Sequence, residues 1–164
     1  MSFDKFIQSR TIAVRGTVGS STRFPVFTLD SFIEFENDGY LIGAHFMTAH
    51  VSDGLAAGAV VIDRPFGFML AKSTGQILSV PAGGNVTAFS GAQILVTHLD
   101  YASNDGAASL NSADRQTTIG YDADTKRIPL KSNDRLGVYI CSNANAVSQN
   151  YSYTLTAYFV SAVS

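Results

Sequence analysis

An alternating run close to the C-terminal end constrains the fold more than any other part of the sequence. Between positions 151 and 160, the side chains of Tyr151, Tyr153, Leu155, Ala157 and Phe159 fall on one side of an extended chain, and those of Ser152, Thr154, Thr156 and Tyr158 fall on the other. Alternation with a period of two is typical of a β-strand. A strand with one apolar face needs a second layer to cover that face, so the run predicts a sandwich or a barrel.

A second alternating run, Arg135–Cys141, precedes the first and is separated from it by the polar stretch 142–150. Two such runs joined by a short polar loop favour an antiparallel hairpin. The pair Asp38-Gly39, between apolar runs, is a second hairpin pattern.

The rest of the chain contains further short runs that favour β-strands. Strands are expected at Thr11–Val18, Phe24–Leu29, Phe32–Glu36, Tyr40–His50, Phe66–Lys72, Gln76–Val80, Val86–Ser90, Ala92–Leu99, Gln116–Tyr121 and Arg127–Lys131. Leu55–Ile62 is the main helix candidate, although its β-branched second half favours a strand. Turns recur about every 8–12 residues, which predicts an all-β antiparallel sandwich or barrel.

The length of 164 residues fits a single domain. Residues 1–9 are interpreted as an N-terminal arm, with the β-sandwich domain at 10–164. Asp100–Arg115 is the longest stretch without periodicity and is expected to be a functional or mobile loop. Gly91 is expected to be a bulge or corner.

Charge is sparse. Charged residues make up 15% of the chain, against about 25% in an average soluble domain. The net charge is −2 and no run of basic residues exists, so a nucleic-acid partner is not expected. Such a surface favours coverage by a partner, and a neutral monomer is the alternative. No apolar stretch is long enough for a membrane span and no signal peptide is recognisable, so we expect synthesis in a cytoplasm.

The segment Arg127–Ile140, followed by Tyr151–Phe159, resembles the closing strands of a jelly roll. C1q/TNF-like trimers and many viral and phage structural proteins end in this way. The resemblance implies a jelly-roll component of a virion that forms a trimer or packs among capsid subunits. It supplies no functional residues.

The sequence therefore favours a structural virion protein that binds copies of itself and other capsid or virion proteins. We expect the contacts to come from the arm, the long loop, the polar stretch after Cys141 and the outer face of the last strand. The candidate residues are Phe3, Phe6, Ile7, Asp100, Tyr101, Asn104, Asp105, Asn143, Asn145 and Tyr158. A carbohydrate- or receptor-binding module that uses Tyr101, Tyr121 and Tyr151 is the alternative.

No pattern of catalytic residues occurs, so we do not expect an enzyme, and no cofactor is expected. His45, His50 and His98 lack the spacing of a metal site. The lone Cys141 is interpreted as an apolar filler.

Overall fold

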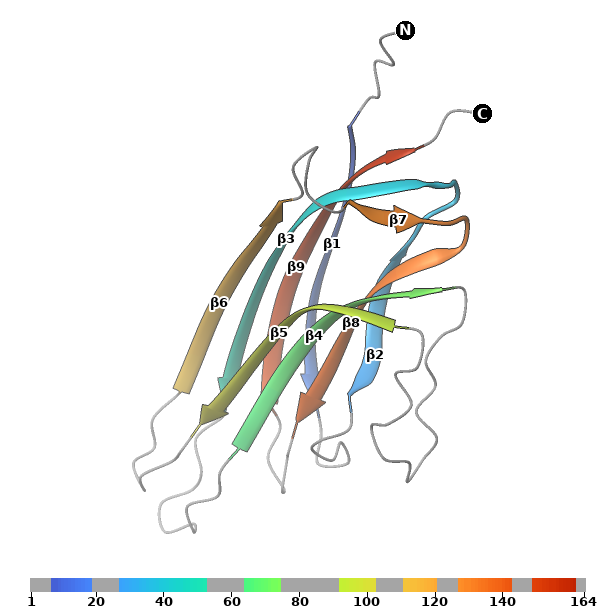
Figure 1. Cartoon of the computed structure of the whole chain (residues 1–164). Helices are drawn as coiled ribbons and strands as arrows, with labels where there is room; N and C mark the ends of the chain where they lie inside the picture. Colours follow the sequence, from blue (N-terminus) through green and yellow to red (C-terminus); the bar gives the residue numbers. More distant parts are fainter. Residues whose placement is uncertain are drawn as a thin grey trace, which may run out of the picture.

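The computed structural model describes residues 7–18, 27–52, 64–74, 92–102, 111–120, 127–142 and 149–161, and every regular element in these ranges is a β-strand (Figure 1). The strands are β1 (Gln8–Val18), β2 (Thr28–Glu34), β3 (Gly39–Ser52), β4 (Arg64–Thr74), β5 (Ala92–Ala102), β6 (Asn111–Gly120), β7 (Ile128–Leu130), β8 (Asp134–Ser142) and β9 (Gln149–Ser161).

The strands form two sheets packed face to face (Figure 1). Sheet A has the order β1-β9-β3-β6, and the short β7 pairs with the beginning of β3. Sheet B has the order β2-β8-β4-β5. All pairings are antiparallel.

Strand order identifies the fold. The long β4–β5 pair is flanked in sequence by three further antiparallel pairs, β3–β6, β2–β8 and β1–β9. Each successive pair lies in the sheet opposite to the one before it. The chain is thus a folded ribbon of eight strands wound across two sheets, which is a jelly roll. The predicted all-β antiparallel sandwich of jelly-roll type is confirmed.

The core lies between the sheets, as the alternation in β9 predicts. Tyr151, Tyr153, Leu155, Ala157 and Phe159 are all buried in one cluster. Opposite them lie apolar residues of sheet B: Ile33, Phe35, Phe68, Leu70, Val96, Leu136, Val138 and Ile140. Phe35 meets Phe159 edge to face with ring centroids 5.1 Å apart, an arrangement that aromatic pairs prefer.

The predicted hairpin between the last two long strands is wrong. β8 pairs with β2 and β4 in sheet B, whereas β9 pairs with β1 and β3 in sheet A. The connection between them therefore crosses from one sheet to the other. The Asp38-Gly39 turn likewise carries the chain from sheet B to sheet A. Alternation tells which side chains share a face, but it does not tell which strand lies alongside.

A register shift corrects the faces expected for Tyr40–His50. In its pairing with β9, β3 shifts register between Leu41 and Gly43. Leu41 therefore shares the core with Ala44 and Phe46, although strict alternation puts it on the opposite side. The same strand was expected to be buried on both faces, yet Met47 is 46% exposed.

Both ends of the loop expected at Asp100–Arg115 belong to strands, and residues 103–110 lie outside the described residues. β5 continues through Ala102 and β6 begins at Asn111. β5 pairs with β4 and β6 pairs with β3, and these pairings extend both strands into the polar sequence. The irregularity in β5 falls where Leu70 and Ala71 of β4 pair with Val96 and Ile94. The helix candidate at 55–62, the expected strands at 76–80 and 86–90, and Gly91 lie outside the described residues.

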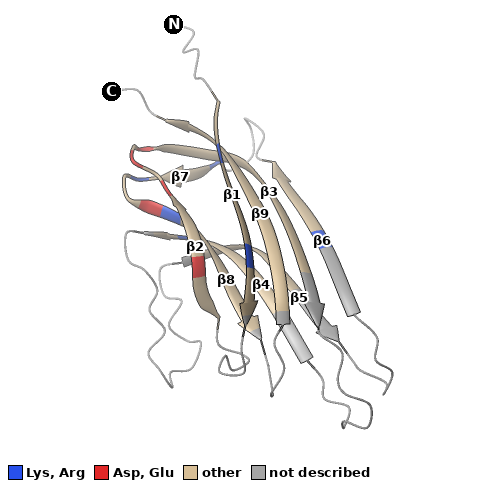
Figure 2. Ribbon diagram, turned by 180° about the vertical axis from the view of Figure 1, so that it is seen from behind, with Lys and Arg blue, Asp and Glu red and all other residues tan. Residues whose placement is uncertain are grey.

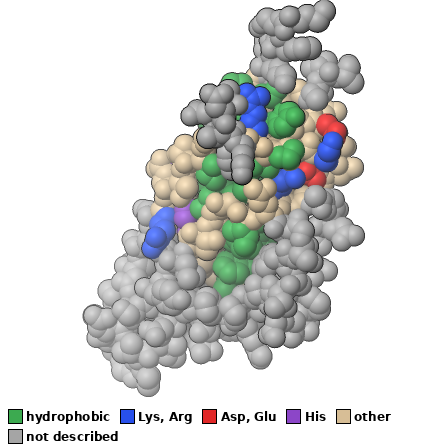
Figure 3. Space-filling model, in the orientation of Figure 1, with side chains coloured by type: hydrophobic (Ala, Val, Ile, Leu, Met, Phe, Trp, Pro, Cys, Tyr) green, Lys and Arg blue, Asp and Glu red, His purple; other side chains and the backbone are tan. Residues whose placement is uncertain are grey.

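The outer side of sheet B is partly covered by apolar residues of the chain itself, although Phe32 and Ile94 on this side are exposed. Met69, Ala71 and Tyr139 point away from the core and are buried in a second apolar cluster, against which Phe27 and Leu29 pack. Cys141 is also fully buried, and burial raises the pKa of its thiol to about 12. Its expected role as an apolar filler fits this position. Seen from this side, apolar side chains gather over the middle of the described surface, with charged ones around them (Figure 3).

Candidate interaction surface

The outer side of sheet A differs from that of sheet B because its centre is open, whereas the centre of sheet B holds the second apolar cluster. We call it the open face and define it by the outward side chains of four strands. They are Thr11, Ala13, Arg15 and Thr17 of β1, Ser152, Thr154, Thr156 and Tyr158 of β9, His45, Met47 and Ala49 of β3, and Gln116 and Thr118 of β6. All of them are exposed or half-buried.

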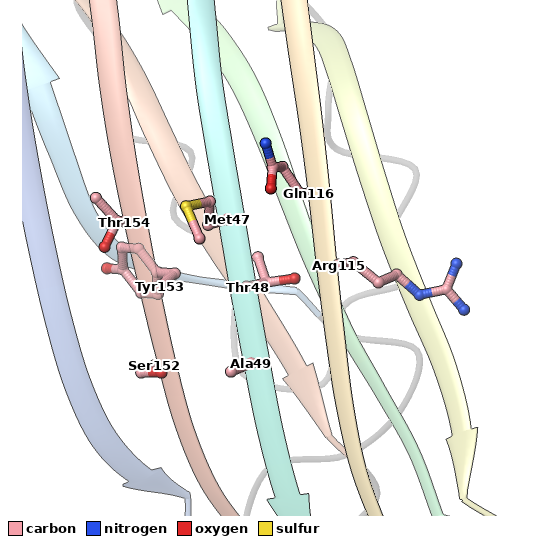
Figure 4. A pocket seen from close by; sticks show the side chains of 8 residues that line it. All are labelled: Met47, Thr48, Ala49, Arg115, Gln116, Ser152, Tyr153 and Thr154. Atoms are coloured by element: carbon pink, nitrogen blue, oxygen red, sulfur yellow. The ribbon is translucent and has the colours of Figure 1, made fainter.

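Strand register arranges these side chains in rows that cross the sheet. One row holds Ala13, Thr154, Met47 and Gln116, and we call it the Met47 row. The next row holds Arg15, Ser152 and Ala49, and we call it the Ala49 row. Figure 4 shows Thr154, Met47 and Gln116 side by side, with Ser152 and Ala49 below them.

Hydrogen bonds between neighbouring strands order the hydroxyl groups of this surface. Thr11 and Thr156 join their hydroxyls at 2.9 Å, and Nδ1 of His45 lies 2.9 Å from Oγ1 of Thr118. The hydroxyl of Thr17 donates to the side-chain oxygen of Asn150 at 2.8 Å. These contacts fix the rotamers of side chains that would otherwise be mobile, so less entropy is lost when a partner covers them.

The open face is almost uncharged. Arg15 is the only Lys, Arg, Asp or Glu among its defining residues, and two further charged residues of β6 lie at its border: Asp114, which pairs with Ala49, and Arg115. In Figure 2, which shows this side of the molecule, the strands of sheet A are mostly free of charge. A sheet surface that faces only water usually carries Lys or Glu along its strands.

The Ala49 row forms the floor of two shallow hollows. One, of about 350 Å³, is lined by Met47, Ala49, Gln116, Ser152 and Thr154 together with Thr48, Arg115 and Tyr153. The other, of about 440 Å³, is lined by Arg15, Gly16, Thr17, Ala49, Asn150, Tyr151 and Ser152. Ala49 and Ser152 belong to both because their short side chains leave space between larger neighbours.

At the β1/β2 edge of the sandwich, a carboxylate joins the two sheets. Asp30 lies where β2 shifts register, between Leu29 and Ser31, and such a bulge can re-aim a side chain. The carboxylate of Asp30 accepts hydrogen bonds from the hydroxyls of Tyr151, at 2.6 Å, and Tyr153. Burial, together with the Asp30 carboxylate, raises the pKa of both tyrosines above its ordinary value.

At the β5/β6 edge, a histidine joins the two sheets. His98 of β5 is buried, with Nδ1 at 2.8 Å from Oγ1 of Thr48 and Nε2 at 2.7 Å from Oγ1 of Thr117. Its ring stacks on Phe46 with centroids 5.2 Å apart. His98 thus joins sheet B to two strands of sheet A, and its neighbours identify a structural role. Within the described ranges, no three His, Cys, Asp or Glu residues are placed to hold a metal ion.

The sequence-predicted contact residues are only partly brought together. Tyr158 is 40% exposed on the open face, and Ile7 is 65% exposed just before β1. Ser9, two residues after Ile7, pairs with Tyr158, so Ile7 and Tyr158 lie at the same end of sheet A. Asp100 and Tyr101 belong to β5 in sheet B. Phe3, Phe6, Asn104, Asp105, Asn143 and Asn145 lie outside the described residues.

The alternative of a sugar site loses one of its three tyrosines. Tyr151 is 9% exposed and its hydroxyl is bound to Asp30, so it cannot serve as an exposed stacking platform. Tyr121 lies outside the described residues.

Sequence reasoning missed Arg15, Met47 and Ala49 as surface partners of the last strand. Arg15 lies in a run with one polar face, so its exposure could have been predicted, whereas both faces of the strand that holds Met47 and Ala49 are apolar and alternation does not tell which is exposed. The positions of all three beside Ser152 or Thr154 depend on the strand order, for which the sequence carries no local pattern.

No protein-family model matches this sequence, and no curated protein matches it either. Among solved structures, the chain is similar to Eiger TNF from S. frugiperda, with 12% identity over 94% of this chain and 96% of that chain and a TM-score of 0.43. The structure of infectious bursal disease virus, Gx strain, matches with 10% identity over 93% of this chain but only 33% of that chain, at a TM-score of 0.46. The decameric BFDV capsid protein matches with 11% identity over 96% of this chain and 99% of that chain, at a TM-score of 0.37.

At these identities and TM-scores, the similar structures carry no argument about what this chain does. The fold is established by strand order and register alone. Within the described strands, the structure contains no helix that is long and apolar enough to cross a membrane.

Proposed function

We propose that this chain is a structural subunit of a virus particle, which uses its open face to bind further copies of itself and neighbouring capsid subunits. It performs this role without catalysing a reaction. The observation that carries the proposal is the contrast between the two outer faces. At the centre of sheet B, outward residues are buried in an apolar cluster of the same chain, although Phe32 and Ile94 on that side are 37% and 52% exposed. Sheet A presents an ordered, nearly uncharged surface across all four of its long strands.

The exposed apolar side chains on sheet A support this reading. Met47 is 46% exposed and Tyr158 is 40% exposed, and both stand among hydroxyl groups. The cores of protein interfaces are depleted of charge and enriched in aromatic residues and methionine. The titles of two of the similar structures name a capsid protein and a virus, which agrees with this role without adding weight to it.

The mass of the purified protein in solution tests the proposal. We expect sedimentation analysis across a range of concentrations to give an assembly of more than one chain, and the resemblance to jelly-roll proteins implies that this assembly is built from trimers. Thr154→Arg, in the middle of the open face, should lower the mass towards that of one chain because it buries a charge at the contact. Thr28→Arg, at an exposed site of sheet B, is the matched control and should leave the mass unchanged.

A protein that remains a single chain at high concentration, and does not bind to preformed particles, would overturn the proposal. Circular dichroism of both variants confirms that the sheets are intact, so that a change in mass reports on association alone.

A further inference from the structure

The two central rows of the open face complement each other in size. In the Met47 row, β3 presents Met47 and β1 presents Ala13. In the Ala49 row the order of sizes is reversed, since β3 presents Ala49 and β1 presents Arg15. Between them, β9 presents Thr154 in one row and Ser152 in the other.

Consider a two-fold axis that lies in the plane of the face, runs parallel to the two rows and passes between them. Rotation about this axis places the Met47 row of one copy over the Ala49 row of the other copy. Met47 then enters the hollow above Ala49 and Ser152, and Thr154 meets Ser152. Arg15 faces Ala13, so the two arginines do not face each other. In such an interface the same patch contacts itself, and residue i meets j wherever j meets i.

The area of the face suits such a pairing. Strands about 4.8 Å apart with a rise of about 3.3 Å per residue give a four-stranded face of about ten residues roughly 600 Å² in plan. Side chains roughen this surface, so the accessible area is larger. A stable interface of standard size buries about 800 Å² on each partner.

From these observations, and resting on the function proposed above, we infer that the occupant of the open face is the same face of a second copy. Two copies pack sheet to sheet about the axis described, with each Met47 seated over Ala49 and Ser152 of the other copy. The strands of the two sheets run within about 30° of each other, as in aligned sheet packing. The assembly therefore contains an even number of copies, which is two, or six if the trimers implied by the resemblance pair through this face.

Disulfide formation between two single variants tests this geometry. Met47→Cys and Ala49→Cys are prepared separately in the full chain, mixed under native conditions and oxidised mildly. We expect a disulfide-linked pair from the mixture, in at least tenfold greater yield than from either variant alone, because only residues 47 and 49 of different copies are in contact. The native Cys141 does not compete, since it is buried and its pKa is raised to about 12.

Thr28→Cys mixed with Ala49→Cys is the control and should give no linked pair. Met47→Ala adds a second readout, because emptying the hollow should weaken association at least tenfold without changing the fold. Equal cross-linking in every mixture, or a wild-type mass of three chains, would overturn the inference.

The two proposals fail differently. If the wild type assembles but the mixture does not cross-link, copies meet through another surface and only the present inference falls. If the wild type remains a single chain and does not bind to preformed particles, the proposed function itself falls.

Discussion

At the scale of single residues, the two open edges of the sandwich are held by polar groups that reach from one sheet to the other. Asp30 binds two tyrosines at one edge, and His98 binds two threonines at the other. Buried polar groups stabilise a fold only when their partners are present. These contacts therefore specify how the sheets align, which the apolar core between them does less strictly.

The tyrosines make the stability of this protein sensitive to alkali. Their pKa lies above the ordinary value of 10.0 in the folded chain. A group with a raised pKa in the folded state contributes stability below its unfolded pKa and loses it as the pH rises towards the folded value. We expect the free energy of unfolding, measured with urea, to fall as the pH is raised above about 10.

The Tyr151→Phe, Tyr153→Phe double variant should show a smaller fall over the same range, although its stability at neutral pH is lower. Tyr158→Phe, which removes an exposed hydroxyl outside this cluster, is the control. An equal fall in all three proteins would contradict the role given to the Asp30 cluster. Any fall that remains in the double variant belongs in part to Tyr139, whose pKa is also raised by burial.

At the scale of elements, the sequence predicts faces well and neighbours poorly. The alternation in β9 identifies its buried residues correctly. The pairing of β8 with β9 is predicted wrongly because a loop between two alternating runs fits a hairpin and a sheet-to-sheet crossing equally well. From the sequence, only the part of the open face that belongs to β9 could be predicted, because the strands beside β9 come from distant parts of the chain.

Close contact between β3 and β9 gives an element-scale prediction. A Cβ atom at Gly39 would lie 2.0 Å from the backbone oxygen of Val160, whereas a Cβ at Gly120 would meet nothing within 4 Å. Gly39→Ala must push β3 away from β9 and should lower the free energy of unfolding by about 1–3 kcal/mol, as overpacking does. Gly120→Ala should change it by less than about 0.5 kcal/mol. Urea unfolding of both variants measures the difference, and equal stabilities would show that the strands separate freely there.

At the scale of the whole molecule, the strands of each pair lie progressively further apart in sequence, from β4–β5 outwards to β1–β9. Among the described strands, β9 is the only neighbour of β1, and it also pairs with β3 along thirteen residues. Removal of β9 therefore splits sheet A in two and uncovers the core.

We expect a chain that ends at residue 148 to show no cooperative unfolding transition in circular dichroism. A synthetic peptide of residues 149–161, present during refolding from urea, should restore the transition. A peptide of the same composition in scrambled order is the control. Cooperative unfolding of the shortened chain by itself would show that β9 is dispensable.

The pairing of Gln8 with Phe159 has a consequence for biosynthesis. While the chain emerges from a ribosome, β1 has no strand beside it until residues 149–161 have been translated. During that interval its edge is free to pair with other nascent chains, and polysomes bring such chains close together. A chaperone that shields the first strand, or a translation rate that shortens the wait, would therefore influence the yield of this protein more than a change in its final stability.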